Sequence, residues 1–415
     1  MTLNKDFRNG FIAGTVLSLA LCYSFFRIYW IMEVGLKYFR WHALLWLYLS
    51  IALLFFGISY TLYKLGRLQT ESARKIYLFC LGLFVAWYVA EGFLRIANIG
   101  RTYTENREGV YVNPAERMQK TWYATWLPNE QRTLASGTEF AFQRTTNSLG
   151  LSDKEWTVAK DTNEIRIITL GDSFTEGDGC AFDSSYPNVL QHLIQALLPD
   201  RKINVMNAGR CGSDPWFEYK KLSDLLLKFK PDIVVYTNGS NDMLFDHLNY
   251  GGFERFAPDS TVKNRIPQPK WLGLYEVSYV FRFITTIWGY DNTLFNAAQR
   301  KKNEVEVIAD AHALSQKYNQ LAHEHNFFCI QLIRPDKHEI IDGRYVFDVK
   351  ELTKGTDTFT RFKTFDLVAF YRDSMQVNQQ NVNNYFWNID QHHNAKGYAL
   401  MAKGAYAAIL PLLKK

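Results

Sequence analysis

Three long apolar segments dominate the first hundred residues. They cover about residues 11–32, 41–63 and 76–96, and each is as long as the roughly 20 apolar residues that an α-helix needs to cross a bilayer. The first segment is too long for a cleaved signal peptide, and no small-residue cleavage site follows it. The pattern predicts a transmembrane region over residues 1–100 with three spans; two spans plus an interfacial helix are the alternative.

Basic residues flank these segments unevenly. Six of them would lie on one side of the membrane: Lys5, Arg8, Lys64, Arg67, Arg74 and Lys75. Only Lys37 and Arg40 lie in the opposite loop. Because basic loops remain in the cytoplasm, we predict a multi-pass protein of the cell membrane with a cytoplasmic N-terminus and an extracytoplasmic chain after about residue 101. Glu91 and Arg95, four residues apart in the third span, can pair on one helix face.

Short β-branched runs alternate with amphipathic stretches from residue 164 onward. Strands are predicted at residues 165–170, 203–206, 233–236 and 327–333, and helices at residues 186–198, 216–229, 305–325 and 395–413. This alternation predicts an α/β domain over residues 164–415, with a parallel sheet covered by helices on both faces. Ligands of such sheets bind at the carboxyl ends of the strands, so polar residues that follow a strand are the candidates for chemistry.

The other segments are irregular. Residues 101–163 are polar and lack periodicity, so we expect a linker and a lead-in that packs against the catalytic domain. Residues 243–303 and 341–388 interrupt the alternation and are predicted to be insertions. The first is too long for a plain loop, and we expect it beside the active site, where it could gate access.

The composition narrows the class of protein. Hydrophobic residues make up 47% of the chain and aromatic residues 16%, which excludes a disordered chain. The apolar segments exclude a purely soluble enzyme, and five cysteines in 415 residues exclude a small disulfide scaffold. The net charge is +6, but no basic run or basic–aromatic stripe indicates a nucleic acid partner.

A serine follows the first predicted strand. Residues 171–177 read GDSFTEG, which places Ser173 at a strand-to-helix turn. A hydroxyl at the mouth of the sheet, beside the start of a helix, suits a nucleophile whose own N–H helps to hold an oxyanion. The alternative is a helix cap, because Asp and Ser are common at that position.

Two further polar blocks follow the second and third strands. Asn207-Ala208-Gly209, then Gly212, follow the second strand, and residues 238–242 after the third read NGSND. A glycine backbone can approach a substrate closely, so the Gly209 N–H is a candidate oxyanion donor, as is the side-chain amide of Asn241. Tight turns are the alternative for both blocks.

A pair of histidines opens the last predicted helix. Residues 390–397 read DQHHNAKG. A histidine can accept the serine proton, and an aspartate two or three residues earlier can fix the histidine tautomer. Adjacent histidines also occur in metal sites, but no further His or Cys lies at ligand spacing here. We therefore predict neither a metal nor a cofactor.

Together, these four blocks resemble the SGNH (GDSL-type) hydrolase family, in the family's order and over about residues 164–413. The resemblance implies a three-layer, flavodoxin-like parallel sheet. It also implies roles for individual residues: Ser173 as nucleophile, Gly209, Asn241 and the Ser173 N–H as oxyanion donors, His392 as general base, and Asp390 as the residue that orients the imidazole.

The choice of base depends on spacing. Family members commonly have Asp three residues before the His, which would make His393 the base. The glycine that usually follows the His by five residues is Gly397, and it selects His392. The resulting Asp-x-His-x-Asn-x-x-Gly pattern resembles the membrane-associated acyl-transfer branch of the superfamily.

Two cysteines, Cys180 and Cys211, lie a few residues beyond the carboxyl ends of predicted strands, in loops that should be neighbours. If the domain is extracytoplasmic, a disulfide between them is one prediction, and two free thiols are the alternative.

These observations predict a membrane-tethered serine ester hydrolase. It would act on O-acyl esters of an envelope glycan or lipid through an acyl-serine intermediate. One alternative is an O-acyltransferase that uses the same Ser/His/Asp site with an acyl donor delivered by a polytopic membrane partner. Another is a non-catalytic SGNH scaffold in an envelope complex, since a fold does not fix a function.

Overall fold

The computed structural model describes most of the chain after residue 124. The described residues are 71, 82, 86–87, 89–94, 96–97, 125–136, 138–258, 262, 271, 275, 278–290, 295–345, 348–376 and 379–414, without the side chains of residues 132, 240–242, 245, 379 and 380. The predicted spans at 11–32 and 41–63, and about half of the one at 76–96, lie outside these residues, as does Arg95. Among the residues that the structure describes, no helix combines the length and the apolar character that a membrane crossing requires.

The chain forms two compact units. Met1–Tyr103 and Pro269–Gly289 make up the first, and Thr104–Gln268 and Tyr290–Lys415 make up the second. The predicted insertion at 243–303 is therefore divided between the two units. Its part in the first unit contains helix α11 (Tyr279–Ile287).

A five-stranded parallel sheet forms the centre of the second unit, as the alternating pattern predicted. Its strand order is β4-β3-β5-β6-β7. The strands are β3 (Glu164–Leu170), β4 (Lys202–Asn207), β5 (Ile233–Gly239), β6 (Phe328–Arg334) and β7 (Phe362–Asp366). In chain order this is the 2-1-3-4-5 arrangement of flavodoxin-like folds, whose ligand crevice opens where the strand order reverses, between β3 and β5.

The edge strand β7 corrects the sequence-based division of the chain, because it lies within the predicted insertion at 341–388. Helix α15 (Leu367–Met375) follows it directly. The segment Phe362–Asp366 reads FKTFD, with Phe362 buried and Lys363 exposed. A short edge strand carries polar residues and no β-branched apolar run, so its pattern did not stand out from a loop.

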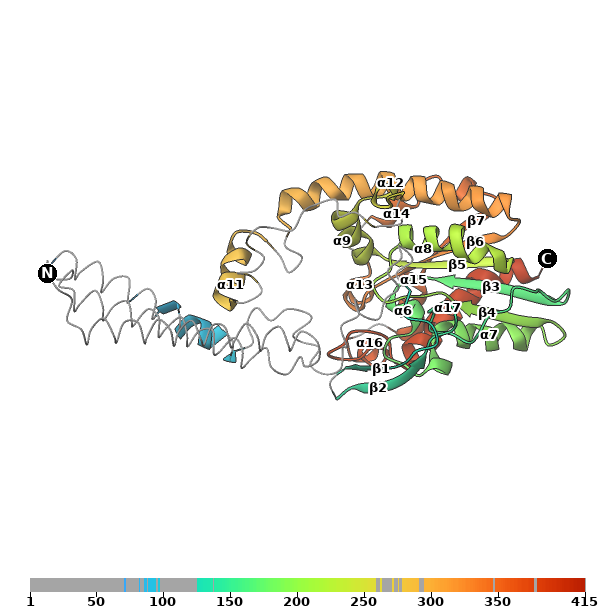
Figure 1. Cartoon of the computed structure of the whole chain (residues 1–415), viewed down its shortest axis with the longest axis horizontal. Coiled ribbons are helices and arrows are strands. Elements are labelled where there is room, and N and C mark those ends of the chain that lie inside the picture. Colours follow the sequence, from blue (N-terminus) through green and yellow to red (C-terminus); the bar gives the residue numbers. More distant parts are fainter. Residues whose placement is uncertain are drawn as a thin grey trace, which may run out of the picture. The chain divides into compact units, whose positions relative to one another are not determined.

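Two apolar cores lie on opposite faces of the sheet. Alternate residues of β5 divide between them, with Val234 and Tyr236 in one core and Ile233 and Val235 in the other, because successive strand side chains point to opposite faces. Helices α8 (Pro215–Lys221) and α12 (Ala297–Glu324) cover the first core, and α7 (Tyr186–Leu197) and α17 (Ala395–Leu413) cover the second (Figure 1). The result is a three-layer α/β architecture.

The remaining elements of the second unit are short. They are the antiparallel hairpin β1 (Gln131–Ser136) and β2 (Phe140–Thr145), α6 (Ser173–Glu176), η2 (Phe182–Ser184), η3 (Leu222–Leu226), η4 (Leu227–Phe229), α9 (Ser240–Tyr250), η5 (Phe253–Arg255), α13 (Lys337–Asp342), α14 (Val349–Leu352), η6 (Thr356–Thr358) and α16 (Gln379–Asn383). Helix α12 begins eight residues before the predicted start at 305, because Asn296 and Gln299 form a capping box there.

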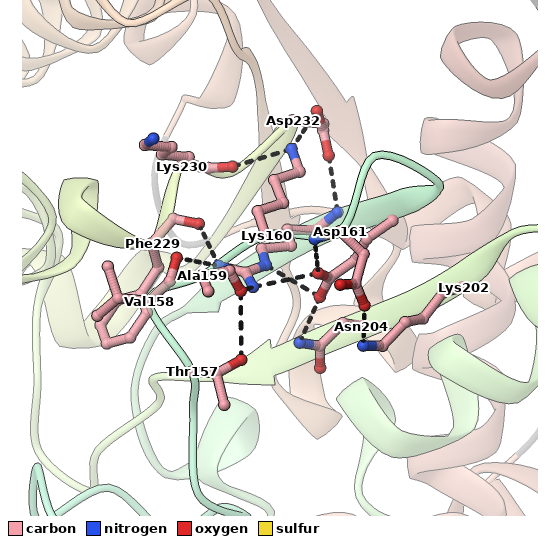
Figure 2. A network of polar contacts seen from close by, with 12 residues as sticks. Thr157, Val158, Ala159, Lys160, Asp161, Lys202, Asn204, Phe229, Lys230 and Asp232 are labelled. Carbon is pink, nitrogen blue, oxygen red and sulfur yellow. Dashed lines mark hydrogen bonds and ion pairs between the residues drawn. The ribbon is translucent and has the colours of Figure 1, made fainter.

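A network of polar contacts closes the amino-terminal edge of the sheet (Figure 2). The Arg166 side chain on β3 is fully buried, and its Nε donates to Glu164 Oε1 at 2.9 Å. Its Nη atoms donate to the backbone oxygens of Val158, Ala159 and Phe229. One guanidinium thus fastens the lead-in segment to the sheet.

Asp232 and Lys160 extend this network. The Arg166 N–H donates to Asp232 Oδ2 at 2.7 Å, and Lys160 Nζ lies 2.7 Å from Asp232 Oδ1. Burial opposes the ionisation of Glu164, but hydrogen bonds from Arg166 and Asn204 lower its pKa to about 2. The carboxylate is therefore ionised at neutral pH, and the network is a charged one.

Candidate active site

Strand β3 delivers Ser173 to the carboxyl-terminal side of the sheet, where the strand order reverses between β3 and β5. It ends at Leu170, Gly171 follows with a φ of 150°, and α6 starts at Ser173. A Cβ at position 171 would lie 2.2 Å from Thr175 Oγ1 and 2.9 Å from the Thr237 oxygen, so only glycine fits this turn. Asp172 caps α6 by accepting the Phe174 N–H at 2.9 Å, which leaves the Ser173 hydroxyl for other chemistry.

Ser173, His392 and Asp390 form one chain of hydrogen bonds. His392 Nε2 lies 2.7 Å from Ser173 Oγ, and His392 Nδ1 lies 2.5 Å from Asp390 Oδ1. Asp390 and His392 are 4% and 6% exposed, while Ser173 is half-buried at the surface of the site. The carboxylate accepts from Nδ1–H, so Nε2 carries the lone pair that can remove the serine proton.

The two-residue spacing between Asp390 and His392 depends on an unusual backbone conformation. Gln391 between them has a φ of 71°, in the left-handed region that few residues other than glycine adopt. This turn brings the carboxylate and the imidazole to the same side of the loop. With this conformation, a spacing of two residues is enough for the contact between Asp390 and His392.

His393 occupies a different environment. It is fully buried, its Nε2 lies 3.1 Å from the Tyr371 hydroxyl, and its Nδ1 lies 3.2 Å from the backbone oxygen of Tyr385. Burial, and then the charge of Arg334, lower its pKa to about 3. His393 is thus neutral and fully engaged, and the structure brings His392, not His393, to Ser173.

Glu139 on the β1–β2 hairpin holds the loop that carries Asp390 and His392. Its Oε1 accepts the N–H groups of Asn388 and Ile389 at 2.8 and 2.9 Å, and its Oε2 accepts that of Asp390 at 2.9 Å. Three consecutive backbone donors form an anion-binding concavity, and here the anion belongs to the same chain. Sequence patterns gave no sign of this contact, which spans about 250 residues.

Arg334, at the end of β6, packs against the Phe174 ring, which in turn contacts the His392 imidazole. Its guanidinium carbon lies 3.6 Å from the centre of the Phe174 ring, and that ring lies 4.8 Å from the His392 ring. Arg334 Nη2 also donates to Asp172 Oδ2 at 3.2 Å. The arrangement joins the serine turn and the histidine through one aromatic ring and one cation.

The expected oxyanion donors need one correction. The Gly209 N–H donates to Asn207 Oδ1 at 2.9 Å, so the structure does not present it to a substrate. Gly209 instead permits close packing, because a Cβ there would lie 2.3 Å from the Glu176 nitrogen. Asn241 lies in the first turn of α9, two residues after β5 ends, and its side chain is outside the described residues.

Gly212, in the same loop, has the properties expected of Gly209. It is exposed, its φ is 72°, and the atom nearest to a Cβ at this position would be Arg210 Nη1, at 3.8 Å. No described residue accepts a hydrogen bond from the N–H of Gly212 or from that of Ser173. The sequence offers two glycines in the NAGRCG segment, and only the structure shows that the second of them is exposed.

A sequence match that covers most of the second unit identifies the family of the chain. A profile of the GDSL-like Lipase/Acylhydrolase family matches residues 169–400, which include the serine turn, the loops after β4 and β5, and the histidine loop. The chain belongs to this family. As a GDSL-type acylhydrolase, it is a hydrolase of ester bonds.

Solved structures that match this GDSL-type chain share little sequence with it. One is a two-domain esterase active on acetylated mannans, with 11% identity and a TM-score of 0.37, where the match covers 61% of this chain and 50% of that chain. Another is a family 3 carbohydrate esterase from Clostridium thermocellum, with 15% identity, a TM-score of 0.36, and coverage of 60% and 98%. The acetyl xylan esterase AlAXEase has 16% identity, a TM-score of 0.36, and coverage of 59% and 100%. No curated protein matches the chain.

Glu176 connects the GDSL turn to the loop that contains Cys211 and Gly212. It is fully buried, three residues after Ser173, and its Oε1 accepts Trp126 Nε1 at 2.9 Å and Ser152 Oγ at 2.6 Å. Its Oε2 accepts the Cys211 N–H at 2.7 Å. The backbone of Cys211, next to Gly212, is therefore hydrogen-bonded to the helix that begins at Ser173.

The cysteines and the possible metal ligands can also be placed. Cys180 and Cys211 are free thiols, which agrees with the second of the two alternatives and not with the disulfide. The Cys180 sulfur is buried and donates to the Gly177 oxygen at 3.3 Å, while Cys211 is held by its backbone to Glu176. Within the described ranges, no group of His, Cys, Asp and Glu side chains could hold a metal ion.

Proposed function

We propose that this GDSL-type hydrolase cleaves O-acyl esters of an envelope glycan or lipid through an acyl-serine intermediate. The observation that carries the proposal is the 2.7 Å contact between Ser173 Oγ and His392 Nε2, with Asp390 at the other imidazole nitrogen. His392 takes the hydroxyl proton as Ser173 Oγ attacks the ester carbonyl. It then gives that proton to the leaving alcohol, and a water molecule activated by the same nitrogen releases the acyl group.

The oxyanion is assigned to backbone donors on two loops. We assign the Ser173 and Gly212 N–H groups to it, in place of Gly209, together with the Asn241 amide. Gly212 suits the role because its neighbour Cys211 is anchored by Glu176, and because Gly212 is an exposed residue whose N–H has no acceptor among the described residues. Each donor of this kind contributes about 10²–10³ in rate.

The location of the enzyme is part of the proposal. The three apolar segments before residue 101 support tethering to the cell membrane, with the N-terminus in the cytoplasm and the hydrolase outside it. A tethered enzyme meets substrates of the envelope more often than freely diffusing esters. This reasoning selects an O-acylated glycan or lipid as the substrate class.

Esterase assays on purified full-length protein test the proposal. We expect hydrolysis of 4-nitrophenyl acetate by the wild type and none by Ser173→Ala, with envelope glycans and lipids richer in ester groups in cells that carry the variant. Acyl transfer to an added sugar in preference to water would identify an O-acyltransferase instead. A folded wild type with no turnover of any ester would indicate a scaffold.

A further inference from the structure

Helix α11 in the first unit has an inverted distribution of polarity. Its buried positions are Tyr279, Arg282 and Thr285, while Phe283 and Ile287 are exposed, as is Trp288 after its end. Arg282 is only 4% exposed. Its Nε donates to the backbone oxygen of Tyr275 at 2.7 Å, and its guanidinium lies over the Tyr275 and Tyr279 rings. A helix in water buries its apolar side chains and exposes its charges, and α11 does the opposite.

In the helical residues 89–94 the acidic residue is likewise buried and two apolar residues are exposed, while Leu94 is buried. Glu91 is 3% exposed, whereas Val89 and Phe93 are 65% and 64% exposed, and Ile96 beyond them is 80% exposed. Val89, Phe93 and Ile96 follow one another at helical spacing, so they share a face that points away from Glu91. Of the twelve large apolar side chains exposed in the described chain, seven belong to the first unit, although it contains few of the described residues.

Glu91 connects these two segments. Its Oε2 accepts Ser278 Oγ at 2.8 Å and the Val280 N–H at 3.0 Å, and its Oε1 accepts the Tyr279 N–H at 2.8 Å. These groups form the first turn of α11, whose backbone N–H groups have no partner within the helix. A carboxylate at a helix start is also favoured by the helix dipole. The acidic residue of the predicted third span therefore fixes a helix from the distant 243–303 segment.

The charge of the first unit indicates the chemistry of its partner. Residues 1–103 and 269–289 contain thirteen basic and five acidic residues, whereas the rest of the chain contains 34 basic and 36 acidic residues. The whole positive excess of the protein thus belongs to the unit with the exposed apolar faces. Apolar surface together with basic charge matches a bilayer with anionic headgroups.

We infer that α11 is a membrane-embedded helix, with Phe283, Ile287 and Trp288 in contact with the acyl chains of anionic phospholipids and with Glu91 as its anchor. A hydrocarbon environment requires every polar group to be satisfied internally, and the buried contacts of Glu91 and Arg282 achieve this. The inserted segment 269–289 then forms a membrane contact in addition to the apolar N-terminal segments. This inference concerns a surface and does not rest on the proposed hydrolysis.

Site-specific photo-crosslinking tests the inference. Benzoylphenylalanine is placed at Phe283 or Ile287 in the full chain, which is reconstituted into vesicles of phosphatidylethanolamine and phosphatidylglycerol. Val305 on α12 and Val158 are matched controls, since both are exposed apolar residues of the second unit. We expect phospholipid adducts at positions 283 and 287 and none at either control position. Equal adducts at all four positions, or adducts only with protein at 283 and 287, would overturn the inference.

Variants of Glu91 test its role as the anchor. Glu91→Gln keeps a carbonyl oxygen for the α11 N–H groups, whereas Glu91→Leu keeps none. The yield of lipid adduct at position 287 should survive in the first variant and fall in the second. Both variants should retain hydrolysis of 4-nitrophenyl acetate, which shows that the second unit is folded. An unchanged yield in the active Leu variant would contradict the assigned role of Glu91.

Discussion

The contact between Glu139 and the catalytic loop makes a quantitative prediction. In Glu139→Ala, the N–H groups of Asn388, Ile389 and Asp390 lose a carboxylate that accepts them at 2.8, 2.9 and 2.9 Å. Hydrogen bonds to a charged group contribute about 1.5–3 kcal/mol each. Glu139 is only half-buried, so solvent screening reduces this, and we expect a total of about 2–4 kcal/mol.

Much of that energy constrains the position of Asp390 and His392. A displacement of about 1 Å in a catalytic group costs about 10²-fold in rate. We therefore expect kcat for 4-nitrophenyl acetate to fall about 10- to 100-fold in Glu139→Ala, with little change in KM, because the substrate does not contact Glu139 in this account. Glu139→Gln retains one acceptor oxygen and should lose less.

A surface carboxylate with a similar bond provides the control. Glu155 accepts the Ser148 N–H at 2.9 Å, and Glu155→Ala should leave kcat unchanged. Measuring kcat at a temperature where both proteins remain folded separates positioning from simple destabilisation. If Glu139→Ala keeps wild-type kcat, or changes only KM, the reasoning about this contact is wrong.

Four other variants test separate parts of the structure. His392→Ala should lower kcat by at least about 10³-fold, whereas His393→Asn should mainly lower the melting temperature, and the reverse would exchange their roles. Burial raises the pKa of Asp153 to about 6, above its unfolded value, so the folded state loses stability as the pH rises from about 4 to 6. In urea titrations, Asp153→Asn should abolish that loss and raise the free energy of unfolding by about 3 kcal/mol at neutral pH. The pKa of Glu164 is instead lowered to about 2, so its contribution is present above about pH 4 and is lost as the pH falls towards 2. Glu164→Gln should cost about 3 kcal/mol at neutral pH and remove this acid sensitivity, and a variant with the wild-type pH profile would contradict the charged network.

The sequence allowed correct prediction of those parts of the fold that local patterns determine. The β-branched runs corresponded to β3, β4, β5 and β6, because buried parallel strands are apolar along their whole length. Strand β7 was missed because an edge strand does not need that pattern. The glycine five residues after His392 was informative because a Cβ at Gly397 would lie 2.5 Å from His393 Nδ1.

Contacts between distant segments could not be predicted in the same way. Glu139 and Glu176 are ordinary acidic residues in the sequence, and only the folded chain gives them backbone N–H partners. The family resemblance assigned the oxyanion role to Gly209, but a sequence pattern does not show that Asn207 accepts the N–H of this glycine in the folded chain. The sequence left the disulfide open for a similar reason, since neighbouring loops need not direct their thiols toward each other.

Labelling with a fluorophosphonate, followed by peptide mass spectrometry, tests the central claim most directly. Only a serine whose proton is removed by a neighbouring base reacts rapidly with this probe. The account predicts one adduct in the folded protein, on Ser173, which is lost in Ser173→Ala and strongly slowed in His392→Ala but not in His393→Asn. An adduct on a different serine, or a folded wild-type protein that does not react, would contradict it.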